Sequence, residues 1–282
     1  VWLAWFLCAV SEAMGRLARI VGKNGGEYFA QANTLAQTVE REAWDENRYI
    51  RAFYDDGTPL GTVNAEYCAM DSIAQSWGAI SGKGNPERVK CALETAEHYL
   101  VNREAGFIRL LTPPFRRSPE NGRDPGYISA YPPGIRENGA QYTHAAVWLA
   151  KAFLCIGETE KGFELLSMLN PINHARTSTE AARYRTEPYV VAADIYSDER
   201  NAGRGGWSWY TGSAAWLYRT VIEDLLGIRR RGKVLTVTPS LPAAWNGYRV
   251  KYRCGDRTYD ISVKRGPDGS AQTENEYIIL EE

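Results

Sequence analysis

Most hydrophobic positions of this chain recur with the spacing of an α-helix. Four windows are apolar over much of the helix surface, and each carries a tryptophan: Trp5, Trp77, Trp148 and Trp216. Each window also ends in a glycine, the residue that most readily takes the left-handed backbone after a helix. We therefore predict four apolar helices, within residues 2–22, 64–82, 143–157 and 213–227.

Short connections lead from the first three apolar windows into more polar segments that have one hydrophobic face. These segments predict amphipathic helices over 27–42, 86–101 and 159–169. Asn85 and Pro86 suit the N-cap and the first turn of the second one. Helical hairpins then alternate with three long connections, over 43–62, 102–141 and 170–211.

This alternation predicts a mainly α fold in which helical hairpins stand in a ring. Long connections are usually functional, so the rim that carries them is the expected place for a site. The apolar helices would form the inner ring, because a helix buried on most sides loses its polar face. The sequence shows about seven helices of such a ring, a partial (α/α)6 toroid. Its open edge would expose hydrophobic surface and favour self-association, with a homodimer as the simplest form.

After Gly227 the hydrophobic pattern changes to a period of two, which is typical of strands. We expect strands within 233–242, 248–265 and 276–282. The sequence therefore predicts two domains. Residues 1–227 would be the C-terminal part of an (α/α)6 barrel, and residues 228–282 a small β domain.

The charge balance argues against nucleic acid or an anionic membrane as a partner, since the formal net charge is −1 and both signs are mixed along the chain. Five cysteines without CxxC spacing and three scattered histidines predict neither a metal site nor a cofactor. Unpaired thiols favour a cytoplasmic location. The apolar run at residues 1–10 is too short to span a bilayer, so we expect no direct membrane contact from this segment. Because this run starts without a cap, we interpret residue 1 as lying inside a larger protein.

Two of the apolar helices begin with residues suited to binding an anion. Thr143 is the expected cap of one, with His144 in its first turn, and Thr211 is the expected cap of the other, with Gly212 after it. If both ends lie on one rim, an imidazole, a hydroxyl and a bare backbone amide could converge on one oxyanion. Each residue alone has an ordinary alternative, because threonine caps are common and a histidine near a helix start is more often a surface residue.

The loop before His144 carries residues that suit sugar recognition. Tyr131, followed by two prolines, offers a stacking face, and Arg136, Glu137 and Asn138 offer hydrogen-bond donors and acceptors. Arg136 and Glu137 are adjacent, so we expect them to point in different directions rather than to pair. A solvated loop is the alternative here, and it is the default interpretation of the charged stretch 43–61. The aromatic, glycine-rich stretch 183–212 is either a lid or a flexible connection.

Several segments closely resemble glycoside hydrolase family 94, the inverting phosphorylases of β-linked glucosides. They are "YPPGIRENGAQYTHAAVW", "EPYVVAADIYS", "WSWYTGSAAWLYRTVIEDLLGIRR" and "LTVTPSLPAAWNGYRVKYR". The segment "EPYVVAADIYS" is most similar to the C-terminal phosphorylase module of cyclic β-1,2-glucan synthases. The resemblance implies a larger parent protein, which could be anchored in the inner membrane. By motif match, the resemblance implies phosphate binding by His144, Thr211 and Gly212. It also implies that Tyr131, Arg136 and Glu137 line the sugar subsites.

The resemblance further implies a toroid followed by a small β domain, and a mechanism. Inorganic phosphate, as co-substrate, would attack the anomeric carbon of a β-linked glucan and give α-glucose 1-phosphate with inversion. The family's general-acid Asp lies in a "DWND"-like segment just before the "VWLAWFLC" helix, and no residue here matches it. We therefore assign no catalytic residue and expect the isolated chain to be inactive. Cellobiose phosphorylases have a Gln near the position of Ala193, so sugar specificity is not carried over.

Two other functions stay open. The chain could be a carbohydrate-binding module without chemistry, or an (α/α)6 glycoside hydrolase that uses water in place of phosphate. A hydrolase would need a second carboxylate to activate that water. A purely structural role would leave the two helix N-termini unexplained.

Overall fold

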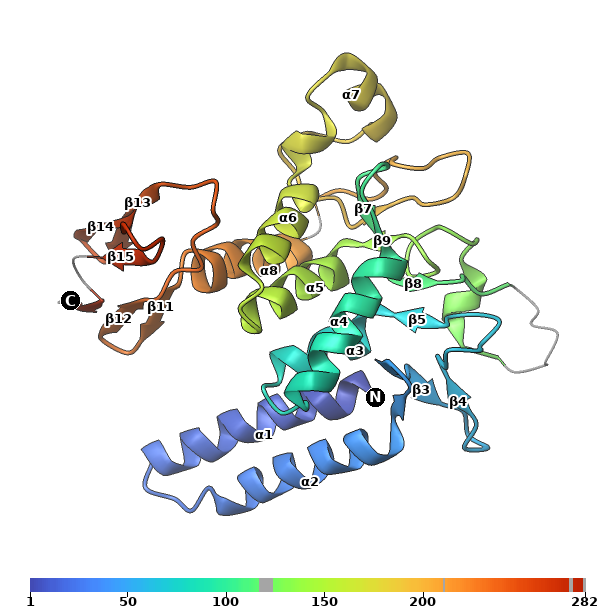
Figure 1. Cartoon of the computed structure of the whole chain (residues 1–282), viewed down its shortest axis with the longest axis horizontal. Helices are drawn as coiled ribbons and strands as arrows, with labels where there is room; N and C mark the ends of the chain where they lie inside the picture. Colours follow the sequence, from blue (N-terminus) through green and yellow to red (C-terminus); the bar gives the residue numbers. More distant parts are fainter. Residues whose placement is uncertain (117–123, 210, 274–275, 281–282) are drawn as a thin grey trace.

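The computed structural model describes residues 1–116, 124–209, 211–273 and 276–280. The molecule is mainly helical, with its longer strands at its C-terminal end (Figure 1). Three helical hairpins confirm the pairs expected from the sequence. They are α1 (Trp2–Ile20) with α2 (Gly26–Glu42), α3 (Ser72–Ile80) with α4 (Pro86–Leu100), and α5 (Thr143–Cys155) with α6 (Thr159–Leu169).

Tight turns close these hairpins in the way the sequence predicts. Gly22, Gly82 and Gly157 have φ angles of +73°, +66° and +81°, in the region that favours glycine. Asn85 caps α4, because its side-chain oxygen accepts hydrogen bonds from two backbone N–H groups at 3.1 Å. The second helix of each pair therefore returns beside the first.

The helix around Trp77 begins later than its hydrophobic pattern predicts. Residues 64–71 lie outside α3, which starts at Ser72. The carboxylate of Asp71 accepts hydrogen bonds at 3.1 Å from two N–H groups of the first turn and so fixes this start. Hydrophobicity does not mark the boundary, because Cys68 and Met70 before it are as buried as the helix itself.

The fourth apolar window does not form one continuous α-helix. It forms α8 (Thr211–Arg219), followed by the π-helical turn η3 (Thr220–Leu225). In the wider turn, the buried Asp224 binds Lys151 Nζ of α5 at 2.5 Å and Arg229 at 2.6 Å. Two cations from different elements thus hold the carboxylate, a constraint that hydrophobic spacing cannot show.

The connection 170–211 contains a helix that its hydrophobic pattern does not predict. α7 (Ser178–Tyr184) follows the 3₁₀ turn η2 (Pro171–His174). Thr177 and Glu180 form a capping box at its start. This spacing of Thr and Glu is a recognised start signal, and it could have found the helix from the sequence.

The apolar helices lie side by side in the order α1, α3, α5 and α8 (Figure 1). One indole from each helix joins a continuous row of rings across them. Trp2, rather than Trp5, belongs to this row, because Trp5 packs against Tyr49 instead, with centroids 5.4 Å apart. The row consists of Trp2, Trp77, Trp148 and Trp216, with neighbouring centroids 5.2 to 6.2 Å apart.

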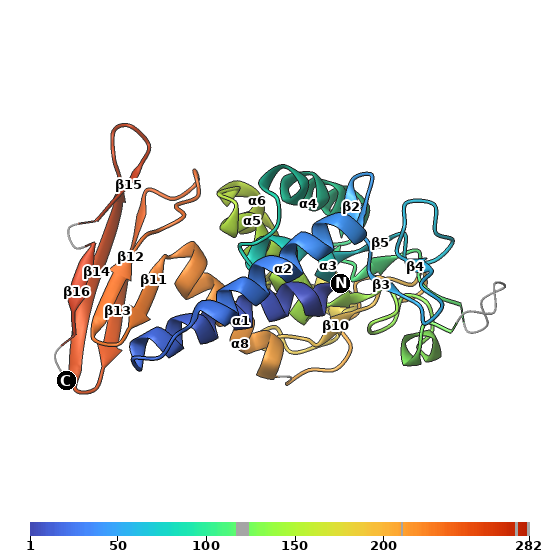
Figure 2. The same cartoon turned by 90° about the horizontal axis from the view of Figure 1, so that it is seen from below.

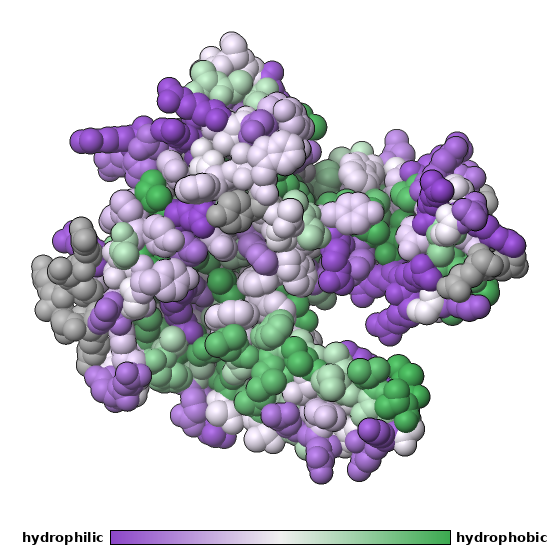
Figure 3. Space-filling view, turned by 180° about the vertical axis from the view of Figure 1, so that it is seen from behind, coloured by the Kyte–Doolittle hydropathy of each residue, from purple (hydrophilic) through white to green (hydrophobic). Residues whose placement is uncertain are grey.

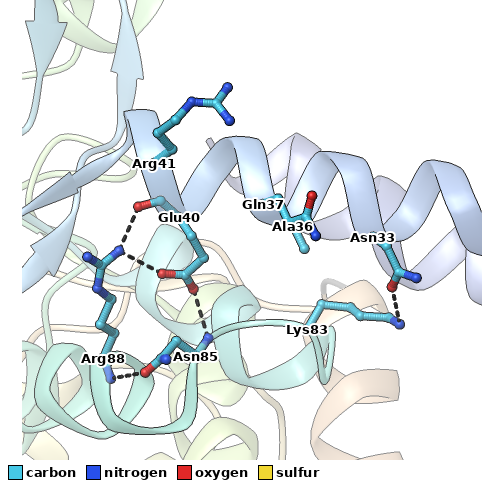
Figure 4. Close-up of a pocket in the computed structure, with 8 residues that line it drawn as sticks. All are labelled: Asn33, Ala36, Gln37, Glu40, Arg41, Lys83, Asn85 and Arg88. Carbon is cyan, nitrogen blue, oxygen red and sulfur yellow. Dashed lines mark hydrogen bonds and ion pairs between the residues drawn. The ribbon is translucent and has the colours of Figure 1, made fainter.

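Polar side chains tie the first two hairpins together (Figure 4). The carboxylate of Glu40 on α2 accepts a hydrogen bond from the backbone N–H of Asn85 at 2.8 Å and pairs with Arg88 at 2.9 Å. It also accepts a hydrogen bond from the hydroxyl of Tyr49 at 2.7 Å. A cavity of 570 Å³ lies between these helices. All of its charged groups are paired, Glu40 with Arg88, Arg41 with Glu42 and Lys83 with Glu12, so we assign it a packing role.

Short antiparallel strand pairs organise the long connections. The last of these pairs joins two connections directly before α5. The pairs are β1 (Trp44–Asp45) with β2 (Arg48–Tyr49), β3 (Ala52–Phe53) with β4 (Pro59–Leu60), β5 (Met70–Asp71) with β8 (Leu111–Thr112), β6 (Val101–Asn102) with β7 (Phe107–Ile108), and β9 (Gln141–Tyr142) with β10 (Asp194–Ile195). A 3₁₀ turn, η1 (Tyr127–Ala130), lies before β9.

Two three-stranded sheets follow η3 and share a separate hydrophobic core (Figure 2). Ile222 and Leu226 pack against that core, so the helices and the sheets are directly continuous. Of the strand expected at 276–282, residues 281–282 lie outside the described residues. The sheets are β11 (Ile228–Arg231), β12 (Val234–Val237) and β16 (Tyr277–Ile279), and β13 (Gly247–Cys254), β14 (Arg257–Arg265) and β15 (Ala271–Thr273).

The helix surfaces bear on whether this chain contacts a membrane or another protein. Among the described residues, no helix combines the length and apolar character needed to cross a bilayer. α1 exposes a hydrophobic stripe, visible as a green band in Figure 3, in which Leu3, Leu17 and Ile20 are 63%, 50% and 81% exposed. A contiguous apolar surface of this kind favours association.

We expect residues 1–282 to self-associate through the stripe on α1. Leu17→Glu should lower the apparent mass in light scattering at high concentration, because burying a charge in the contact is costly. Ile172→Glu, at an exposed apolar residue of η2, is the matched control and should leave the mass unchanged. A wild-type chain that remains a monomer at every concentration would contradict this expectation.

Candidate functional site

The N-terminal ends of three apolar helices meet at one cavity of 270 Å³. Trp2 of α1, Ile73 of α3 and His144 of α5 all line it, so three helices direct their positive dipole ends toward the same space. The long connections supply most of the remaining wall. It comprises Arg51, Leu110, Pro125, Tyr127, Ile128, Glu137 and Tyr142, with Ala145 and Trp148 of α5.

His144 is half-buried between two indoles. Its ring centroid lies 4.5 Å from that of Trp148 and 6.1 Å from that of Trp216. Burial lowers the pKa of His144 below its ordinary value, so the neutral imidazole dominates at neutral pH. Its Nε2 atom is buried and has no hydrogen-bond partner within the described part of the chain. A ligand that supplied such a partner would remove an energetic cost.

The start of α8 lies against His144. A Cβ atom built on Gly212 would lie 3.7 Å from Nδ1 and 3.8 Å from Cε1 of His144, so a side chain would occupy the space beside the ring. Glycine leaves that space to a ligand and to its own backbone N–H. Thr211 is exposed and is the first described residue of α8, so its role as the cap stays a prediction. Tyr210 lies outside the described residues.

Thr143 is also the first residue of its helix, so its prediction as the cap of α5 was wrong. The N-cap is Tyr142, whose side chain makes no capping hydrogen bond. The N–H of Thr143 donates to the carbonyl of Ala193 at 2.9 Å, and its hydroxyl accepts from Gln141 at 3.3 Å. Pairing between β9 and β10 thus satisfies the start of α5 without a capping side chain.

Arg136 and Glu137 pair, although their adjacency predicts that they point in different directions. Arg136 Nε lies 3.8 Å from Glu137 Oε2, and the two side chains are only 14% and 15% exposed. The φ of Arg136 is +51°, and this left-handed turn departs from the extended chain that would separate the two side chains. Of the two, only Glu137 is among the described residues that line the cavity, and its buried Oε2 has no hydrogen-bond partner among them.

Asn138 and Tyr131 support the loop rather than the cavity. The Asn138 amide donates to the carbonyls of Phe115 and Tyr131 at 2.9 and 2.8 Å and accepts from the N–H of Phe115 at 2.7 Å. Both of its donors are therefore occupied. Tyr131 is not among the described lining residues, whereas Tyr127, with its ring centroid 6.4 Å from that of Tyr131, is one. No pattern in the sequence favours Tyr127 over Tyr131.

Asp194 is a fully buried carboxylate that the sequence patterns did not single out. Its Oδ2 accepts from the N–H of Arg136 at 3.2 Å, and its Oδ1 accepts from the N–H of Trp207 at 3.3 Å. Burial raises the pKa of Asp194 above its ordinary value, and the charge of Arg136 offsets part of that effect. Asp194 thus joins the loop before α5 to the loop before α8. A lone charge inside the apolar run "VVAADIY" is the signal that could have found it.

Arg51 brings a positive charge to the cavity, paired with Asp71 of the α3 cap. Burial opposes the charge of Arg51, but the Asp71 carboxylate together with Cys68 and Tyr127 outweighs it, so the pKa of the guanidinium lies above its ordinary value. The stretch 43–61, which the sequence predicts to be a solvated loop by default, therefore contributes Arg51 to the wall. Within residues 1–116, 124–209, 211–273 and 276–280, no cluster of His, Cys, Asp and Glu suits a metal ion.

Comparison with known proteins shows to which family this chain belongs. A sequence model described as "Glycosyl hydrolase 94 superfamily, catalytic domain" matches residues 1–227. The cyclic beta-(1,2)-glucan synthase NdvB of Rhizobium meliloti (strain 1021) is 46% identical over 267 residues, which are 94% of this chain and 9% of that protein. An N,N'-diacetylchitobiose phosphorylase of Vibrio furnissii is 30% identical over 86% of this chain and 30% of its own length. A cellobionic acid phosphorylase of Neurospora crassa is 26% identical over 93% of this chain and 33% of its own length.

This chain thus spans less than two thirds of each of these relatives. Two solved structures from Thermus thermophilus share its fold. One, an uncharacterized conserved protein, aligns with a TM-score of 0.51 and 16% identity over 78% of this chain and 46% of its own. The other, a GH63 mannosylglycerate hydrolase in complex with glucose, aligns with a TM-score of 0.50 and 14% identity over 76% and 46%.

At these identities the two structures speak for the helical fold alone. The sequence match is more specific, because it extends over residues 1–227 and so includes the cavity, His144 and the start of α8. This chain belongs to the glycosyl hydrolase 94 superfamily.

Proposed function

We propose that this chain forms the phosphate-binding and sugar-binding side of an inverting glycoside phosphorylase site. The substrate would be a β-linked glucan, β-1,2-linked by preference, and the product α-glucose 1-phosphate. The observation that supports this best is the position of Gly212 beside the ring of His144, which itself lines a partly open, partly polar cavity. The names of the relatives add support, since they are phosphorylases of sugars and a β-1,2-glucan synthase.

Phosphate would bind between the starts of α5 and α8. The proposed donors are the imidazole of His144, the hydroxyl of Thr211 and the backbone N–H of Gly212. Helix N-termini favour anions because their first N–H groups are unpaired and the dipole is positive there. Held in line with the anomeric carbon, phosphate is itself the nucleophile, so positioning takes the place of the general base of an inverting hydrolase.

The sugar would occupy the cavity. Glu137 offers an acceptor without a hydrogen-bond partner among the described residues, and Tyr127 offers an aromatic face. Arg136 would act on the sugar through Glu137, because the pair fixes the direction of that carboxylate. Tyr131 would act through the loop, where its carbonyl binds Asn138. The proposal places the general acid outside residues 1–282, and we expect these residues alone to release no glucose 1-phosphate.

A hydrolase is the second candidate, because a hydrolase shares the fold. Water would then replace phosphate, and the reaction would not depend on phosphate. Phosphorolysis of β-1,2-glucooligosaccharides, measured as glucose 1-phosphate in a protein that contains this segment, separates the two candidates. Release of free glucose at the same rate with and without phosphate would refute the phosphorylase. Absence of both reactions would favour a carbohydrate-binding module.

His144→Ala in that longer protein should raise the KM for phosphate more than the KM for glucan. Loss of one hydrogen bond to a charged ligand predicts an increase of about 10- to 100-fold. His98→Ala, at an exposed histidine of α4, is the matched control and should change neither constant. Equal increases in the two KM values for His144→Ala would count against the assignment.

Inorganic phosphate should raise the pKa of His144 in residues 1–282, because burial lowers it in the free chain and a bound anion stabilises the imidazolium. By linkage, protonation of His144 should strengthen binding of the phosphate dianion as the pH falls toward the raised pKa. An NMR titration of the imidazole signals, with and without phosphate, measures this shift. His98 serves as the internal reference, and a shift equal to that of His98 would argue against a site.

Asp194→Ala should lower the free energy of unfolding by about 1–3 kcal/mol, because two backbone N–H groups lose their acceptor. It should also raise the KM for glucan, since Arg136 loses its anchor. Asp194→Asn keeps an acceptor oxygen and should cost less. Urea unfolding measures both variants against Asp268→Ala, whose carboxylate lies in an exposed turn. Unfolding midpoints equal to that of the control would show that Asp194 does not hold the two loops together.

A further inference from the structure

Two large aromatic side chains are exposed just before α8, and the exposed ring of Tyr189 lies beside one of them. Tyr189, Trp207 and Trp209 are 74%, 63% and 68% exposed, and we call these three residues the aromatic platform. Grouped exposed apolar side chains often mark a ligand or partner surface. Trp209 lies two positions before Thr211 in the chain, and Gly212, the next residue of α8, lies beside His144.

Two members of the platform are held in a fixed arrangement. The ring centroids of Trp209 and Tyr189 are 6.5 Å apart, with an interplanar angle of 72°. Trp209 Nε1 donates to Glu187 Oε1 at 3.1 Å. Hydrogen bonds from its own backbone and from the Trp209 and Ser208 side chains hold the pKa of Glu187 below its ordinary value. Rings that are fixed before binding lose little freedom on contact with a ligand.

The backbone beneath the platform is both strained and anchored. Trp209 has a φ of +64°, which is rare for a bulky side chain and is usually retained only for a function. Trp207 is fixed through its backbone, because its N–H donates to Asp194 at 3.3 Å and its carbonyl accepts from Ala193 at 2.6 Å. The chain therefore directs these indoles into solvent from a rigid base.

The size of the cavity indicates which ligand could reach the aromatic platform. A volume of 270 Å³ equals roughly nine waters at about 30 Å³ each, the order of a single sugar ring. A longer glucan has to leave the cavity and run along the rim. An indole face packs well on the C–H face of a glucosyl unit, while a neighbouring carboxylate such as Glu187 can accept hydrogen bonds from sugar hydroxyls.

We propose that the aromatic platform binds a glucosyl unit of a longer glucan outside the cavity, so that the protein prefers oligosaccharides to disaccharides. The inference rests on the proposed function for the identity of the sugar, β-1,2-linked glucose. It does not depend on catalysis, and binding alone can test it.

Calorimetric titration of residues 1–282 with a β-1,2-linked glucose disaccharide and with longer linear β-1,2-glucooligosaccharides is the test. Tyr189→Ala and Trp209→Ala should each weaken oligosaccharide binding by about 3- to 10-fold and leave disaccharide binding unchanged. Trp209→Phe keeps an aromatic face and should restore most of the loss. Tyr277→Ala, at an equally exposed ring of β16, is the matched control and should bind like the wild type.

Tyr189→Ala also guards against a folding artefact, because it leaves the strained backbone at Trp209 in place. Equal loss of disaccharide and oligosaccharide binding would overturn the proposal, since the rings would then act on the cavity. Affinities that match Tyr277→Ala, or wild-type binding that does not increase with chain length, would overturn it as well. The variants could weaken oligosaccharide binding selectively while a protein that contains this segment shows no phosphorolysis. That result would support the aromatic platform and refute the proposed reaction.

Discussion

The site depends on one constraint, which is that each hairpin is closed by a tight turn. Gly22, Gly82 and Gly157 take left-handed backbone conformations, so the chain reverses directly after each apolar helix. The apolar helices then start on one side and pack side by side. Trp2, Ile73 and His144 consequently line the same cavity, although long connections separate them in the chain. The helix dipoles converge there because every long connection returns to the same rim.

The loops above this rim are held by buried polar groups. Asp194 accepts backbone N–H groups from two connections, and Asn138 uses its whole amide within one of them. Loops of this length are rarely rigid without such anchors. Glu137 Oε2 and His144 Nε2 are among the buried side-chain atoms that have no hydrogen-bond partner within the described residues. Both lie at the cavity, which is where a polar ligand would satisfy them.

Aromatic side chains near the site fall into a packed group and a solvent-exposed group. The indole row from Trp2 to Trp216 packs the helix starts together and holds His144 between two rings. The platform of Tyr189, Trp207 and Trp209 carries comparable rings but leaves them in solvent. Aromatic residues in this superfamily member thus build the wall of the site and, in our proposal, extend it along a glucan.

The sequence by itself determined the hairpins, the glycine turns and the stretches that meet at the site, because spacing and caps are local properties. α6 begins and ends where its pattern predicts, and Asn85 caps α4 as expected. Tertiary structure alone decided which charges pair and which are buried. Arg136 binds Glu137, and Asp194 lies at zero exposure, because two connections distant in the chain close over them. The π-turn of η3 likewise follows from ion pairs across elements, which the order of residues along one segment cannot encode.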